Sequence, residues 1–88
     1  MYSRQDVLIK TKITDKETVE KLVKPICDFV DKHDAYFSLG YDSETNRLMA
    51  SYEVEGKTSA YCKGVVSEIK QMLKDAFNCK IEVLFYAY

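Results

Sequence analysis

The segment from Thr58 to Asn78 constrains the fold of this chain more than any other stretch. Its apolar residues recur every three or four positions, as they do in a helix with one buried face. Such a helix is not stable alone in water, because its apolar face must be covered by a second apolar layer, which we expect to be a β-sheet. The positions on this face are Cys62, Val65, Val66, Ile69, Met72, Leu73, Ala76 and Phe77.

Four other segments alternate between the two faces of a strand and are therefore predicted to form that sheet. In the first, Val7, Ile9 and Ile13 share the covered face. In the last, we expect Ile81, Val83 and Phe85 to face the core, with Leu84 and Tyr86 on the opposite face. In the third, the inward positions are Leu48, Ala50, Tyr52 and Val54. The predicted strands are Asp6 to Ile13, Tyr36 to Tyr41, Arg47 to Glu55 and Lys80 to Tyr88.

A second helix is predicted between the first two strands. Thr14 and Glu17 have the spacing of a capping box, in which each side chain satisfies a backbone donor at the start of a helix. The apolar face keeps its phase across Pro25, so we expect one kinked helix. His33 follows the end of this helix, where we expect it to be solvated.

The predicted order is strand, helix, strand, strand, helix, strand. With right-handed crossovers this order gives an α+β, ferredoxin-like split β-α-β fold, in which both helices cover one face of a four-stranded antiparallel sheet. The first and third strands are then central, and the second and fourth are edges. We expect residues 1–88 to form one domain, because a chain of 88 residues supports a single two-layer core.

The composition excludes several function classes. Thirteen basic and fourteen acidic residues give a net charge of -1, which provides no general attraction for nucleic acid or anionic lipid. We find no signal peptide or membrane span and expect a cytoplasmic protein. The cysteines at 27, 62 and 79 are odd in number and widely spaced, so we expect reduced thiols, with Cys27 and Cys62 buried.

No pattern in the sequence indicates catalysis, and we expect no enzyme activity, cofactor or metal. His33 has no cysteine or serine at a spacing typical of a nucleophilic site. The carboxylate pairs at 28/31 and 53/55 have common surface spacings. The string Gly56-Lys57-Thr58 lacks the upstream glycine of a phosphate-binding loop.

RNA binding is the first alternative, because RNA recognition motifs share this order of elements. Arg47 occupies the basic start of that family's longer consensus, and Lys10 and Lys12 are further candidate contacts. The positions that stack bases in that family fall here on Leu8, Met49 and Ser51, so we expect weak nucleic-acid binding at most. An accessory subunit of an enzyme complex is the second alternative.

Protein binding is the favoured function. Neither edge strand has full protection against pairing, and Tyr36 to Tyr41 contains no lysine, glutamate or proline. We expect this edge to pair with another protein or with a second copy, and Ser38→Pro to abolish the association without unfolding the chain. In size and class the chain is similar to phage or mobile-element inhibitors such as anti-CRISPR proteins. The candidate contact residues are Tyr36, Ser38, Gly40, Met49, Leu84, Tyr86 and Tyr88.

Overall fold

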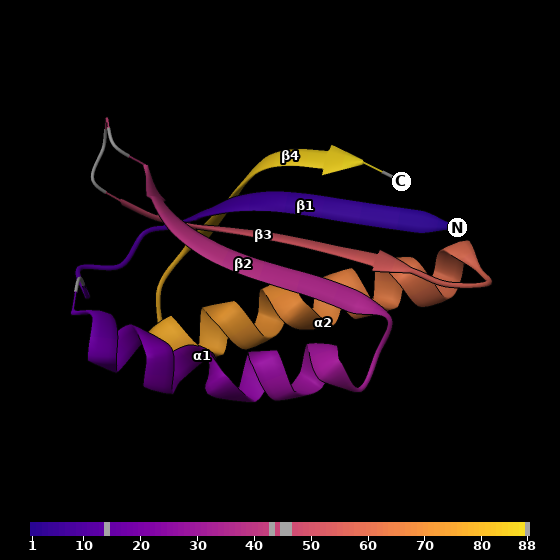
Figure 1. Ribbon diagram of the computed structural model, residues 1–88. Helices are drawn as coiled ribbons and strands as arrows, with labels where there is room; N and C mark the ends of the chain where they lie inside the picture. The colour runs from indigo at the N-terminus through magenta and orange to yellow at the C-terminus, as the bar shows by residue number, and fades with distance from the viewer. Residues whose placement is uncertain (14, 43, 45–46, 88) are drawn as a thin grey trace.

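The computed structural model describes residues 1–13, 15–42, 44 and 47–87. They form one antiparallel sheet in the order β2-β3-β1-β4. Both helices lie against the same face of this sheet, and the other face is open (Figure 1). The predicted ferredoxin-like fold is therefore confirmed. Its elements are β1 (Tyr2–Ile9), α1 (Lys16–Asp31), β2 (Ala35–Asp42), β3 (Arg47–Glu55), α2 (Ser59–Phe77) and β4 (Ile81–Ala87).

Helix α2 has the predicted limits. The Thr58 hydroxyl accepts a hydrogen bond from the Tyr61 amide at 3.1 Å, which caps the first turn. Asn78 ends the helix in the left-handed conformation, with φ at 48°. The apolar face is buried between these caps, with Ile69 and Leu73 fully inaccessible.

Helix α1 begins one residue later than the capping box predicts. Its cap is Asp15, whose carboxylate accepts a hydrogen bond from the Thr18 amide at 2.7 Å. The hydrogen bonds from Thr18 hold the pKa of Asp15 below its usual value. Glu17 instead pairs with Lys21 at 3.7 Å, and Thr14 lies outside the described residues. The helix continues through Pro25, as expected.

Strand β1 is displaced toward the N-terminus from its predicted limits. It pairs with β3 without interruption from Tyr2, opposite Glu55, to Ile9, opposite Leu48. The prediction was wrong because polar residues occupy two core-facing positions: Ser3 is buried, and Gln5 accepts a hydrogen bond from the Tyr52 hydroxyl at 2.7 Å. The expected burial of Val7 and Ile9 is confirmed.

Strand β3 supplies the centre of the core, as predicted. Leu48, Ala50, Tyr52 and Val54 are all buried against the helices. The Tyr52 ring stacks on Phe37 of β2, with ring centroids 6.3 Å apart. Burial and the nearby Asp6 charge raise the pKa of Tyr52, so its hydroxyl is a donor at every physiological pH.

One expectation about a single residue is wrong, and another holds only in part. Cys27 is exposed, because it lies on the outer face of α1, whereas Cys62 is buried as expected. His33 is half-buried between the helices, where its ring lies 4.4 Å from Phe29 and its Nδ1 lies 3.1 Å from the Tyr61 hydroxyl. Among the described residues, no helix is long and apolar enough to span a membrane.

Candidate functional site

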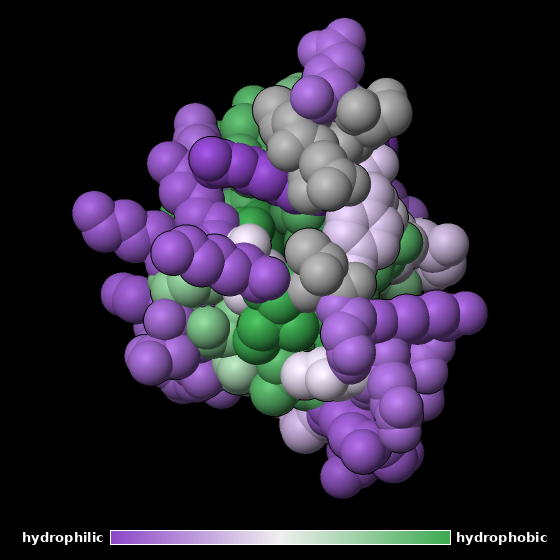
Figure 2. Space-filling view, turned by 90° about the vertical axis from the view of Figure 1, so that its left-hand side faces the viewer, coloured by the Kyte–Doolittle hydropathy of each residue, from purple (hydrophilic) through white to green (hydrophobic). Residues whose placement is uncertain are grey.

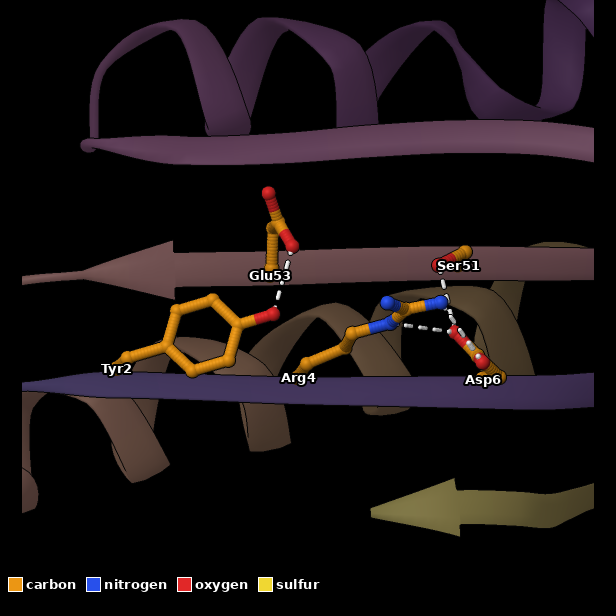
Figure 3. A network of polar contacts seen from close by, with 5 residues as sticks. All are labelled: Tyr2, Arg4, Asp6, Ser51 and Glu53. Carbon is orange, nitrogen blue, oxygen red and sulfur yellow. Dashed lines mark hydrogen bonds and ion pairs between the residues drawn. The ribbon is translucent and has the colours of Figure 1, made fainter. Parts of the chain in front are cut away.

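The open face of the sheet carries a polar network along its two central strands (Figure 3). The Arg4 guanidinium donates two hydrogen bonds of 3.1 Å to the Asp6 carboxylate, which also accepts one of 2.6 Å from the Ser51 hydroxyl. Burial opposes ionisation of Asp6, but the bonds from Ser51 and Arg4 outweigh it, so the pKa of Asp6 is lowered. The bond from Ser51 joins β3 to β1 across this face.

The same face is acidic beyond this network. The Tyr2 hydroxyl donates to Glu53 at 2.8 Å, and this bond raises the pKa of Tyr2. Because Arg4 is held by Asp6, Glu53 forms no ion pair with any other described residue. Ser51, one of the positions that stack bases in RNA recognition motifs, therefore lies beside the Asp6 carboxylate, and a carboxylate repels phosphate.

The basic residues proposed as nucleic-acid contacts lie away from this network. Lys10 pairs with Glu82 at 3.2 Å, Lys12 is exposed in the segment after β1, and Arg47 is exposed at the start of β3. Figure 2 shows the end of the molecule that carries the segment between β1 and α1 and the start of β4. It shows apolar surface in the middle, with groups of hydrophilic side chains on both sides of it.

Strand β4 contains a β-bulge that changes which of its residues face the helices. Val83 lies opposite Val7, but Phe85 lies opposite Asp6, so Leu84 is the extra residue. Phe85 consequently lies on the open face, 50% exposed, with the Arg4 guanidinium 5.7 Å from its ring centroid. Tyr86 packs against the core. The predicted orientations of Phe85 and Tyr86 are therefore wrong, because the bulge reverses the alternation.

The other predicted contact residues fall into two separate groups. Tyr36, Ser38 and Gly40 share the open side of β2, and Gly40 lies opposite Met49 of β3. Leu84 lies on the opposite edge of the sheet, with β3 and β1 between the two groups. Tyr88 lies outside the described residues.

The direction of the backbone groups on β2 follows from one bond. The Glu55 amide donates to the Asp34 carbonyl at 3.0 Å. Bonded and non-bonded pairs alternate along an antiparallel ladder, so Tyr36, Ser38 and Gly40 direct their backbone groups toward β3. Phe37 and Leu39 direct theirs toward the free edge. Ser38→Pro would therefore remove a bond inside the sheet, and the expectation that it leaves the fold intact is withdrawn.

The free edge of β4 is irregular by the same reasoning. The Lys10 amide donates to the Lys80 carbonyl at 3.1 Å, so the groups of Ile81 and Val83 point away from β1. Beyond the bulge, the next outward position is Tyr86. Because this spacing breaks the period of two, a straight strand cannot pair along the whole of β4.

Two hollows lie along the regular edge at β2. One, of about 390 Å³, adjoins the start of the strand, and its lining includes Tyr2, His33, Tyr36 and four acidic residues, which are Asp31, Asp34, Glu53 and Glu55. The other, of about 320 Å³, lies over the open face and includes Gly40, Met49 and Ser51 in its lining. Gly40 has no side chain to fill this space, and a Cβ built there would meet no atom within 4 Å.

Sequence reasoning missed Phe85, Glu53 and the outward backbone groups of Phe37 and Leu39. Phe85 was missed because a bulge depends on the pairing partner. Glu53 was examined only as half of a carboxylate pair, although its alternation with the buried Tyr52 places it on the open face. Among the described residues, no group of three or more histidine, cysteine, aspartate or glutamate side chains is arranged to hold a metal ion.

Comparison with known proteins defines the fold and nothing more specific. No family model and no curated protein matches the sequence. Among solved structures, the chain is similar to a de novo designed protein with ferredoxin fold, LFR1 1, with a TM-score of 0.64 and 15% sequence identity. The match covers 97% of this chain and 86% of the designed protein. At this identity the likeness establishes a ferredoxin-like fold.

Proposed function

We propose that this chain is a small non-catalytic protein-binding module that takes an extended segment of another protein as a further strand on β2. It acts as an inhibitor or an adaptor by occupying that segment. Strand addition of this kind draws its affinity from backbone hydrogen bonds and its specificity from alternate side chains.

The observation that carries the proposal is the regular, uncharged edge of β2. The strand pairs with β3 without a register shift from Ala35 to Asp42, and no charged residue occurs before Asp42. Phe37 and Leu39 direct backbone groups outward at the spacing that an added strand requires. Natural edge strands usually carry lysines, prolines or bulges that prevent such pairing, and β2 carries none of these.

The edge at β4, on the other side of the sheet, is less suited to an added strand than the edge at β2. Strand β4 has the more apolar edge, with Leu84 49% exposed beside Phe85. Its bulge interrupts the outward backbone groups, and the ion pair between Lys10 and Glu82 lies close to its start. A side-chain contact fits this edge better than an added strand does.

The proposal is tested by residue-specific amide hydrogen exchange. In the free protein, the amides of Phe37 and Leu39 should exchange faster than those of Tyr36 and Ser38, because only the second pair bonds to β3. Peptides selected from a displayed library of short random sequences should slow exchange at Phe37 and Leu39. Peptides that bind without protecting these two amides would contradict strand addition at β2.

Matched variants distinguish the contribution of the outward backbone donor of Leu39 from that of its side chain. Leu39→Pro removes the donor and the side chain, whereas Leu39→Ala removes the same packing but keeps the donor. We expect both variants to fold with reduced stability, and only Leu39→Pro to lose binding of the selected peptides. Ser38→Pro should be the least stable variant, because its missing donor faces β3. Equal peptide binding by both Leu39 variants would contradict the proposal.

A further inference from the structure

We propose that the segment bound at β2 carries a lysine or arginine beside Tyr36 and a large apolar side chain four residues away, beside Gly40. This inference rests on the proposed function, because it names the chemistry of the strand that the edge accepts. It follows from the two hollows along β2, which differ in the charge of the residues that line them.

The position beside Tyr36 is suited to a basic side chain. In an added strand, the residue opposite Tyr36 lies on the open face, and Glu53 lies on the next strand inward. Adjacent strands are about 4.8 Å apart, so Glu53 is about two strand spacings away, within the combined length of a lysine and a glutamate side chain. Tyr36 is 62% exposed, and a cation that crosses its ring gains a cation–π contact.

The charges around this position favour a cation. None of the four carboxylates that line the hollow forms an ion pair with another described residue, and the lining contains no lysine or arginine. Lys57 is a competing cation, because it lines a neighbouring hollow together with Asp34 and Glu55. Arg4 lies opposite Glu53 but is engaged by Asp6.

The position beside Gly40 is suited to a large apolar side chain. Gly40 leaves the side of Met49 uncovered, and the residue of an added strand opposite Gly40 lies on the same face. Side chains on that face recur every two residues, so Tyr36 and Gly40 set a separation of four positions in the partner. The separation is four residues in both parallel and antiparallel pairing. The order of the two side chains along the partner is reversed between the two cases.

Two synthetic peptides test the inference. They are Thr-Lys-Thr-Val-Thr-Phe-Thr and its reverse, Thr-Phe-Thr-Val-Thr-Lys-Thr, both with blocked ends, and the reverse order suits antiparallel pairing. We expect one of them to protect the amides of Phe37 and Leu39 in an NMR titration. Replacing its lysine by glutamate should weaken binding about fivefold, the effect of one partly exposed cation–π and ion-pair contact.

Variants of the protein localise each preference. Glu53→Gln should reduce the lysine preference while keeping the bond from Tyr2, and Glu68→Gln, an exposed change of equal charge on α2, should not. Gly40→Val should weaken binding of the phenylalanine peptide about threefold or more but leave the fold intact, because the added atoms enter open space.

Each contrary result identifies what has failed. Selected library peptides that protect Phe37 and Leu39 while both synthetic peptides fail to bind would overturn the partner chemistry and leave strand addition standing. Equal binding of the lysine and glutamate peptides would also overturn it. Protection of these amides without any peptide, together with a dimer in light scattering, would show that the edge serves a second copy and would overturn the inference.

Discussion

Asp6 is the residue that ties the central strands together on the open face. Its carboxylate accepts from Arg4 on its own strand at 3.1 Å and from Ser51 on β3 at 2.6 Å, and the second distance is typical of a charge-assisted hydrogen bond. The Asp6 side chain is 25% exposed and that of Arg4 is 41% exposed, so solvent screens the ion pair in part. The bond from Ser51 links the two strands and is therefore the more direct contribution to stability.

Asp6→Asn should lower the free energy of unfolding at neutral pH by about 1–2 kcal/mol, because the variant loses the charge that both donors recognise. The folded pKa of Asp6 is depressed below 3.8, so its contribution is complete above that pH and is lost as the pH falls through the folded pKa. The difference between wild type and variant should therefore vanish in acid. Chemical denaturation over a pH series measures it.

The matched control for Asp6 is Asp28→Asn. Asp28 is an exposed residue of α1 that pairs with Lys24 at 3.4 Å, and exposed pairs of this kind contribute little. We expect the control to follow the wild type across the pH series. An Asp6→Asn deficit that persisted unchanged in acid would contradict an electrostatic origin.

At the scale of an element, β4 shows how one extra residue redirects a strand. Leu84 has no partner on β1, so the residues beyond it change faces: Phe85 turns out and Tyr86 turns in. The backbone groups of β4 that point away from β1 also lose their spacing of two residues. The same residue therefore sets the composition of the open face and protects the β4 edge from strand pairing.

Deleting Leu84 should leave the chain folded, because Val83 remains opposite Val7 and Phe85 remains opposite Asp6 in regular alternation. The outward groups of β4 then follow a period of two, so we expect more self-association than in the wild type. Light scattering together with a denaturation curve measures both effects. Leu84→Ser, which keeps the extra residue, is the control, and unfolding of the deletion variant would show that the bulge is required.

Elements whose faces are uniform in chemistry could be predicted from the sequence. The apolar residues of α2 recur at helical spacing, and the buried residues of β3 alternate with more exposed ones. Both elements were predicted within one residue of their observed limits. The start of β1 was not predicted, because the polar residues Ser3 and Gln5 lie on the helix-facing side, where the strand pattern requires apolar residues. The candidate edge was predicted, but the direction of its donors depends on the ladder of bonds to β3, which a sequence does not contain.

For the whole molecule, the packing of both helices on one face leaves the other face to define the surface chemistry of the sheet (Figure 1). That face combines acidic groups at Asp6 and Glu53 with aromatic groups at Tyr36 and Phe85. Of its bases, Arg4 is engaged by Asp6 and Lys10 is paired with Glu82. Such a face suits a protein segment better than a polyanion.

We expect binding to a single-stranded RNA to be weaker than micromolar at physiological salt, because the net charge is -1 and the stacking positions are not aromatic. Fluorescence anisotropy with a labelled oligonucleotide measures this. Arg47→Ala should change any residual affinity by little, and tight, salt-sensitive binding would support the RNA-binding alternative instead.

The antiparallel pairing of the first and last strands determines how the domain resists force. Arg4 lies opposite Ala87, so both chain ends lie at the same end of the β1–β4 ladder, as Figure 1 shows. Tension applied between the ends peels β4 from β1 and breaks their hydrogen bonds one after another. Tension between Tyr2 and Lys80 would instead load the same bonds together in shear. Single-molecule pulling should therefore unfold the domain at lower force from its ends than from those two positions.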